Sequence, residues 1–314
     1  MTITPEEKSA LKFRGLIMTR DGEHFIVRIV SPCGVFTDKQ LDAVSECARK
    51  YGSGKIAMTT RLTVEIMDVP YENLEPIVAA VEAVGLVTGG TGSVVRPVVA
   101  CKGSYCVHGL IDTQAFGDRL FKEFYLPYHG VKLPHKFKIG VGGCPNNCIK
   151  PAFHDFGIMA QKVPEYDQDS CMACKKCAVI DKCPVKAFSH DDDGTLVLDE
   201  NKCTNCGKCV GACSFDTIEQ KAFGLKVTIG GIWGKTQRVG TPVPGLYTED
   251  EVVKLIEKAI LIYREQGITG ERFGRCVDRI GAENFIQQML SDDILERKQQ
   301  ILDAKLHLTG GATC

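Results

Sequence analysis

The chain has 314 residues, enough for about two domains, and its hydrophobic content of 44% supplies the apolar surface of true cores. The 38 Lys and Arg residues nearly balance 39 Asp and Glu residues, so the net charge of −1 excludes the overall attraction that nucleic-acid and anionic-membrane binders use. No apolar run approaches the roughly 18 residues of a membrane span, and the first residues lack the apolar core of a signal peptide. We therefore expect a cytoplasmic globular protein without a membrane span or a nucleic-acid partner.

Residues 1–92 are expected to form a ferredoxin-like α+β domain. β-rich runs predict strands at 25–30, 56–60 and 64–69. A capping box of Thr37 and Gln40 opens a first helix, and a second helix over 74–84 stops at Gly85. The side chains expected on the apolar face of the first helix are Leu41, Val44, Ala48 and Tyr51. This order of elements is that of a ferredoxin-like half-unit, which by itself indicates no chemistry.

Residues 93–164 and 221–314 are expected to form a second, α/β domain. Strands are predicted at 94–100, 135–141 and 227–229, and the first two lead into cysteine pairs. One helix is predicted at 113–125. Another begins after Thr248, where Glu251 completes a capping box, and continues to Gln266 before Gly267.

Sixteen cysteines decide the class of protein. In a chain expected to stay in a reducing compartment, such a dense set indicates metal binding rather than disulfides. Twelve of them fall into three groups. The other four are Cys33, Cys47, Cys276 and Cys314, and Cys47 is expected in the core because it lies beside the apolar face of the first helix.

Residues 165–220, rich in Cys, Lys and Asp, are expected to form an inserted ferredoxin domain with two [4Fe–4S] clusters. Two C-x2-C-x2-C runs repeat about 32 residues apart. Three thiolates in such a run can enclose one corner of a cubane, and the fourth, distant Cys ligates the other cluster. One cluster is therefore assigned to Cys171, Cys174, Cys177 and Cys213, and its partner to Cys203, Cys206, Cys209 and Cys183. Two zinc sites are the alternative, although zinc normally takes paired C-x2-C arms without a third Cys in step.

The third group joins Cys101 and Cys106 to Cys144 and Cys148, 38 residues after the first pair. Both pairs follow predicted strands on turn residues. Four thiolates suffice for another iron–sulfur cluster or for a zinc ion. The iron–sulfur pattern elsewhere in the chain favours the cluster, and zinc stays open as the alternative.

The motif Gly-Gly-Cys-Pro-Asn-Asn-Cys at 142–148 follows a Lys-x-Lys strand and a Val-Val-Ala-Cys-x-Gly segment at 98–103. Together they resemble the sirohaem-and-[4Fe–4S] signature of the sulfite and nitrite reductase family. Thr-Thr-Arg at 59–61 and Gly-Glu-Arg-Phe-Gly at 270–274 are similar to that family too, so the resemblance covers nearly the whole chain. It is strongest to the anaerobic sulfite reductase C subunits and related small sirohaem sulfite reductases.

The resemblance implies that the third group binds a third [4Fe–4S] cluster and that Cys148 is also the axial ligand of the sirohaem iron. A shared thiolate would make an electron at the cluster available at the iron without a separate hop. The first pair of the family is usually C-x5-C, whereas Cys101 and Cys106 form C-x4-C.

The resemblance also implies a cationic pocket for a small anion, where fixed positive charge polarises S–O or N–O bonds and relays protons. The residues at the family's substrate positions are Arg61, Arg96, Lys136 and Lys138. Lys235 and Arg238 are candidates for pairing with sirohaem carboxylates, with a surface turn as the alternative. His108 and His154 lie near cysteine groups, and a structural role is the simpler interpretation for both.

The implied function is the six-electron reduction of sulfite to sulfide, with electrons passing through the two ferredoxin clusters. No G-x-G-x-x-G fingerprint follows a strand, so the low-potential donor is expected to be an external ferredoxin or flavoprotein. Two alternatives stay open: reduction of nitrite to ammonia, and a non-catalytic iron–sulfur electron-transfer subunit.

Longer members of the family carry two copies of this unit, with cluster cysteines from one half and substrate cations from the other. This chain has one copy. We therefore expect a homodimer or larger oligomer with composite sites, in which the four cations of one subunit face the sirohaem of another. Supply of the second half by a different subunit is the alternative.

Overall fold

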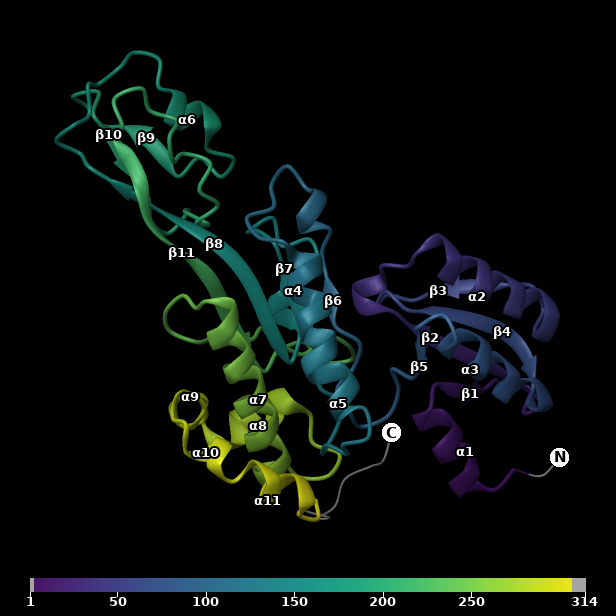
Figure 1. The fold of residues 1–314 in the computed structure, drawn as a ribbon. Helices are drawn as coiled ribbons and strands as arrows, with labels where there is room; N and C mark the ends of the chain where they lie inside the picture. The colour runs from purple at the N-terminus through teal and green to yellow at the C-terminus, as the bar shows by residue number, and fades with distance from the viewer. Residues whose placement is uncertain (1–2, 307–314) are drawn as a thin grey trace.

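The computed structural model describes residues 3–306, which form two five-stranded sheets packed with helices and one small two-stranded sheet. Figure 1 shows the N-terminal sheet on one side of the molecule and a longer sheet on the other, with a small segment at the far end of the longer sheet. Across the described residues, no helix is long and apolar enough to cross a membrane.

The N-terminal sheet is antiparallel, in the order β1-β2-β4-β3, and β5 also pairs with β2. Its strands are β1 (Leu16–Met18), β2 (His24–Val30), β3 (Ile56–Met58), β4 (Val64–Pro70) and β5 (Val87–Thr88). Helix α1 (Pro5–Phe13) precedes the sheet, and α2 (Asp38–Tyr51) and α3 (Leu74–Glu82) pack against it and each other. The apolar faces of α2 and α3 share one core with β2 and β4. The predicted strand and helix order is confirmed; α1, β1 and β5 are additions.

Two local predictions for this sheet were wrong. The strand expected at 56–60 ends at Met58, because the Thr59 N–H donates to the Thr63 carbonyl and Leu62 has a φ of 58°, which together close a tight turn. Arg61 lies at the tip of that turn. Leu41 is 44% exposed rather than buried, since the first turn of α2 meets the end of α3 through Gln40, whose amide donates to the Val84 carbonyl.

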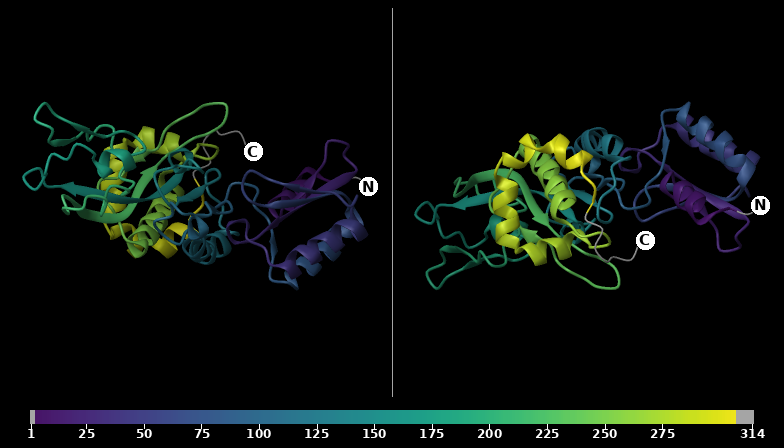
Figure 2. Two further views of the ribbon diagram at one scale, coloured as in Figure 1. Left: turned by 90° about the horizontal axis from the view of Figure 1, so that it is seen from above. Right: turned by 90° about the horizontal axis from the view of Figure 1, so that it is seen from below.

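The second sheet has the order β12-β11-β8-β7-β6, with β6, β7 and β8 parallel and the remaining pairs antiparallel. Its strands are β6 (Val99–Ala100), β7 (Ile139–Gly142), β8 (Phe156–Tyr166), β11 (Ile218–Ile229) and β12 (Thr241–Pro242). The helices are α4 (Thr113–Leu120), α5 (Leu126–Tyr128), α7 (Glu249–Gln266), α8 (Phe273–Ile280), α9 (Ala282–Leu290), α10 (Asp293–Glu296) and α11 (Lys298–Asp303). One large core joins sheet and helices, and the C-terminal helices gather beside the sheet in both views of Figure 2.

The parallel strands are shorter than the sequence predicts. Residues 94–98 are regular only at a bridge between Val95 and Phe137, so β6 and β7 start late. The helix expected over 113–125 passes at Phe121 into a π-helical turn. The capping box at Thr248 is confirmed and starts α7, which ends before Gly267.

Strands β8 and β11 extend beyond the sheet as a two-stranded ribbon that carries residues 167–217 (Figure 1). This segment contains α6 (Ala178–Lys182), β9 (Phe188–His190) and β10 (Leu196–Leu198). It has a small core of its own, formed by Val179, Phe188, Leu196 and Ile218 together with several cysteines. So small a core is typical of a module stabilised by bound metal.

Candidate functional site

The first two cysteine pairs leave the carboxyl ends of neighbouring parallel strands. Val99 pairs with Gly140 and Ala100 with Val141, so the loops after β6 and β7 start side by side. The Gly143 N–H donates to Cys101 Sγ at 3.2 Å, which links the loops directly. Ligand sites in open parallel sheets form at this edge, where loops from several strands converge.

The four thiols of these loops, Cys101, Cys106, Cys144 and Cys148, form the 101–148 set. Burial raises the pKa of Cys144, and the nearby thiols of the other three add to that rise. Within residues 3–306, no three or more His, Cys, Asp or Glu side chains converge closely enough to hold a metal ion. Four thiols carried by two neighbouring loops nevertheless supply the number and kind of donors that an iron–sulfur cluster takes. Cys148 is the exposed member, so its sulfur can also meet a second group.

The inserted segment brings together one of its two predicted ligand sets. Cys183, Cys203, Cys206 and Cys209, the 183–209 set, line a single apolar cavity. Burial raises the pKa of Cys209 to about 11, and the other three thiols contribute to the rise. The Ala187 N–H donates to Cys183 Sγ at 3.2 Å. Cys183 thus lies beside the three cysteines of the second run, and its role as their fourth ligand stays a prediction.

The other set, Cys171, Cys174, Cys177 and Cys213, is the 171–213 set. Cys171, Cys177 and Cys213 pack against the same small core. Cys171 Sγ accepts the Leu196 N–H at 3.4 Å, and Cys213 Sγ accepts the Phe215 N–H at 3.4 Å. Such N–H···S contacts are the polar environment that stabilises thiolate-bound clusters.

The four predicted substrate cations lie together although they come from three parts of the chain. Arg61, at the β3–β4 turn, donates to the Pro97 carbonyl, and Arg96 donates to the carbonyls of Gly92 and Gly90 at 3.0 and 2.6 Å. Burial lowers the pKa of Arg61 to about 10, and repulsion from Arg96 contributes. Burial likewise lowers the pKa of Lys138 to about 8, with repulsion from Arg61 and Lys136 among its causes.

Asp155 and Arg272 belong to this basic cluster and were not predicted as site residues. Asp155 is fully buried; one oxygen accepts the Lys138 N–H at 3.0 Å, and the other pairs with Arg272 Nη2 at 3.2 Å. Burial raises the pKa of Asp155, an effect opposed by Arg272 and Lys138. Arg272 stands in the 270–274 motif, which was a usable signal. No sequence signal marks Asp155, because only folding brings its carboxylate to the Lys138 N–H.

Two buried donors of the cluster have no partner among the described residues, Arg61 Nε and Arg272 Nε. Buried polar groups are normally satisfied, so such donors need a specific reason. Burial, reinforced by the surrounding cations, keeps two nearby histidines neutral: the pKa of His154 falls to about 3 and that of His135 to about 4. A small oxyanion would satisfy the free N–H groups and offset the repulsion.

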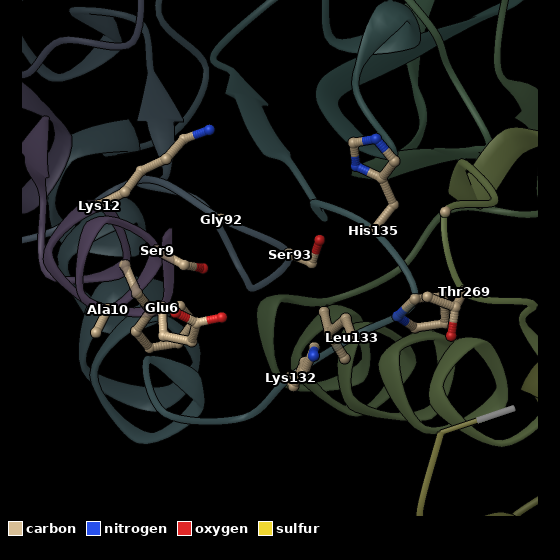
Figure 3. A pocket seen from close by; sticks show the side chains of 13 residues that line it. Glu6, Ser9, Ala10, Lys12, Gly92, Ser93, Lys132, Leu133, His135 and Thr269 are labelled. Atoms are coloured by element: carbon tan, nitrogen blue, oxygen red, sulfur yellow. The ribbon is translucent and has the colours of Figure 1, made fainter. Parts of the chain in front are cut away.

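A cavity of about 520 Å³ adjoins the basic cluster. Figure 3 shows Glu6, Ser9 and Lys12 of α1 on one side of it and Lys132, His135 and Thr269 on the other. Gly92, whose carbonyl accepts the Arg96 Nε–H, lies between the two sides. The four predicted cations are not among its lining residues, so it is a neighbour of the cluster and not its pocket.

The remaining candidates have structural contacts or lie at the surface. Arg238 pairs with Asp278 at 2.8 Å and donates to the Gly230 carbonyl, which ties this loop to α8. Lys235 and His108 are exposed. The ungrouped Cys33, Cys47 and Cys276 are buried thiols, which confirms Cys47 as a core residue, and Cys314 lies outside the described residues.

The basic cluster and the 101–148 set occupy opposite ends of β6 and β7. Arg96 precedes β6 and Cys101 follows it; Lys138 precedes β7 and Cys144 follows it. At about 3.3 Å per residue, the six steps from Lys138 to Cys144 span at most about 20 Å. One chain therefore carries the 101–148 set at one end of these strands and the basic cluster at the other.

Two family models match most of the chain. The "Nitrite and sulphite reductase 4Fe-4S domain" matches residues 91–297, and the "Nitrite/Sulfite reductase ferredoxin-like half domain" matches residues 17–84. The coenzyme F420-dependent sulfite reductase of Methanocaldococcus jannaschii is 31% identical over 283 residues, which cover 88% of this chain and 44% of that protein. The chain thus spans less than half of that relative.

The C subunit of the anaerobic sulfite reductase of Salmonella typhimurium is 30% identical over 304 residues, covering 86% of this chain and 84% of that relative. Among solved structures, dissimilatory sulfite reductase I superposes with a TM-score of 0.67 at 23% identity, covering 84% of this chain and 68% of that one. That likeness confirms the predicted α+β fold class, a ferredoxin-like domain beside an iron–sulfur domain. On the family models and these relatives, the chain belongs to the nitrite and sulphite reductase family.

Proposed function

We propose that this protein reduces sulfite to sulfide with six electrons at a sirohaem linked through Cys148 to a [4Fe–4S] cluster, fed by two ferredoxin clusters. The observation that carries the proposal is the convergence of Arg61, Arg96, Lys136 and Lys138 on one site. Among the described residues, the buried Nε–H groups of Arg61 and of the neighbouring Arg272 lack a partner there. The relatives named above are sulfite reductases.

The residues present fit the implied cofactors. Each of the three cysteine sets supplies four sulfur donors, the number that a cubane needs. Cys148 is exposed at the edge of its set, and a cavity of about 270 Å³ begins beside it at Asn147. When bound, sirohaem supplies an iron that takes up the substrate and passes electrons to it.

The chain's own residues bind the anion and supply protons. The planar guanidinium groups of Arg61 and Arg96 suit the oxygens of sulfite, whereas the ammonium groups of Lys136 and Lys138 are mobile proton donors. A pKa of about 8 lets Lys138 give up a proton near neutral pH, where an exposed lysine would keep it. Asp155 holds the backbone at Lys138 and the Arg272 side chain in place.

We propose further that the site is composite. Because cations and thiolates of one chain lie at opposite ends of β6 and β7, a macrocycle at Cys148 would meet the cations of a second copy. A homodimer with two such contacts is the simplest closed arrangement. An external low-potential ferredoxin or flavoprotein completes the electron supply.

A visible spectrum and a rate measurement test the proposal together. Protein purified anaerobically should show the Soret and long-wavelength bands of sirohaem above broad cluster absorption, and should form sulfide faster than ammonia at equal sulfite and nitrite concentrations. Clusters without a macrocycle would indicate an electron-transfer subunit. Faster ammonia formation would make nitrite the substrate.

Substitutions in the basic cluster test whether its cations serve sulfite turnover. Arg96→Ala and Lys136→Ala should retain the spectrum but lose at least tenfold in sulfite turnover, since each removes a cation that stabilises developing charge. Lys39→Ala, which removes an exposed lysine in the first turn of α2, is the control and should change turnover less than twofold. Unchanged rates in both pocket variants would remove them from the substrate site.

A further inference from the structure

Strand β8 separates the two ferredoxin cluster sites along its length. Lys162 forms a parallel bridge with Cys206, and its N–H donates to the Asn205 carbonyl at 2.9 Å. Four residues farther from the sheet, Tyr166 neighbours Cys171. Four residues of strand span about 13 Å. The 183–209 set therefore lies nearer the second sheet than the 171–213 set does.

The near set also shares a cavity with the 101–148 set. Cys144 and Cys206 both line one space of about 180 Å³. Its other walls come from residues 107–110, Asn146, Lys162 and the Gly207–Lys208 turn. The 171–213 set contributes no residue to this lining. Of the two sets in the inserted segment, the 183–209 set is therefore the one that meets the 101–148 set at this cavity.

This junction is closely packed and positively charged. Gly207 has a φ of +68°, and a Cβ placed on it would lie 2.6 Å from Lys162 Cβ, so the 206–208 turn rests directly on the lysine stem. Lys162 is half-buried, and Lys208 lies at the surface of the same cavity. Two lysine side chains thus line the space that the two thiol sets share.

We propose that the 183–209 set holds the inner ferredoxin cluster, which passes electrons to the 101–148 cluster, and that the 171–213 set holds the outer one, which receives them. In this proposal the positive charges of Lys162 and Lys208 stabilise the reduced states of the two clusters that meet at the junction. In each step one electron leaves the inner cluster, which is oxidised, and reduces the 101–148 cluster. The external donor then returns one electron to the inner cluster through the outer cluster. This inference rests on the clusters of the proposed function.

The internal repeat provides a matched pair of variants. Lys208 stands between Cys206 and Cys209, and Lys176 stands at the same place between Cys174 and Cys177. Lys208→Met and Lys176→Met each remove one exposed charge beside a cluster and keep an unbranched side chain. Redox titration of the whole protein, followed by electron paramagnetic resonance, measures the potential of each cluster.

Removing a cation disfavours the added electron, so each variant should lower the potential of the ferredoxin cluster beside it. We expect Lys208→Met also to lower the potential of the 101–148 cluster and Lys176→Met to leave it unchanged. Lys162→Met should reproduce the effect of Lys208→Met. A shift of the 101–148 cluster by Lys176→Met alone, or by no variant, would overturn the inference while leaving the proposed function intact. Wild-type protein without three clusters by iron analysis would instead refute the proposed function.

Discussion

Lys138 shows how surroundings change what one residue can do. Its side chain is half-buried among Arg61, Lys136 and Arg272, and its pKa drops from the usual lysine range to about 8. The same residue exposed on a strand would stay charged throughout the physiological range. The pKa follows from the neighbours and not from the Lys-x-Lys pattern.

The depressed pKa predicts a pH dependence with a definite sign. In the proposed mechanism the ammonium form of Lys138 binds and protonates the anion. This form predominates below pH 8 and is lost as pH rises through about 8. We expect kcat/KM for sulfite to fall about tenfold per pH unit above that value. Lys138→Arg, which stays charged, should flatten this limb; an unchanged limb in that variant would assign the titration to another group.

Asp155 is the residue on which the basic cluster depends for its geometry. Asp155→Asn removes the carboxylate that pairs with the half-buried Arg272 guanidinium. Breaking such a pair leaves a charge uncompensated, so we expect the free energy of unfolding in urea to drop by about 3 kcal/mol. Asp278→Asn breaks the more exposed pair with Arg238 and should cost less than about 1 kcal/mol. Equal losses in the two variants would contradict this account.

At the scale of the element, β7 connects the basic cluster to the cysteine loop that follows the strand. It starts after Lys138 and ends before the Cys144 loop, and its glycines let neighbours approach closely. A Cβ on Gly140 would lie 2.7 Å from the His154 ring, and one on Gly142 would lie 2.9 Å from Pro151. One face of β7 therefore carries glycines, which leave room for the segment 150–155 to pack against that face.

Gly140→Ala tests that packing. The added methyl group must displace His154 or the strand, so we expect a loss of about 1–3 kcal/mol in unfolding free energy and weaker sulfite binding through Lys138. Gly130→Ala is the control, because no atom lies within 4 Å of its added Cβ. Binding and stability that match the control would show that β7 tolerates a side chain at this point.

Much of the element order could be read from the sequence because its signals are local. Capping boxes at Thr37 and Thr248 and the apolar stripes behind them depend on residues three or four positions apart. The wrong predictions concern strand length and side-chain burial, which depend on contacts between residues far apart in the chain. The strands before Cys101 and Cys144 shorten because their pairing partners set their length, and Leu41 is exposed because α3 meets Gln40 instead.

For the candidate site, the cysteine sets and four cations could be named from spacing and family resemblance. Asp155, and the junction lysines Lys162 and Lys208, could not. Asp155 comes 17 residues after Lys138 along the chain, and Lys162 meets Gly207 across the β8 ribbon. No local pattern marks such pairs, because the contacts exist only after the sheet has formed.

At the scale of the whole molecule, the chain has half of each proposed active site at each end of its second sheet. Lys138 and Cys148 variants should therefore complement each other. Lys138→Ala and Cys148→Ser homodimers should both be inactive, but a mixture refolded from denaturant or coexpressed should recover about a quarter of wild-type turnover, since half of randomly paired dimers would carry one intact site.

The control for that experiment is a pair of variants that inactivate the same half. Lys138→Ala mixed with Arg96→Ala leaves every site with a missing cation, so no recovery is expected. Full turnover by dilute monomeric protein, measured alongside sedimentation, would show instead that one chain forms a complete site.

By itself the sequence determined the residues on which the proposed chemistry rests, twelve cysteines in cluster spacing and four cations in family positions, because ligand sets and motifs are written in short intervals. The tertiary structure decided how these parts relate. Parallel pairing of β6 and β7 separates cations from thiolates by the length of a strand, and the β8 ribbon brings Cys206 to Cys144. Sheet geometry sets those distances, and pairing between segments far apart in the chain creates it.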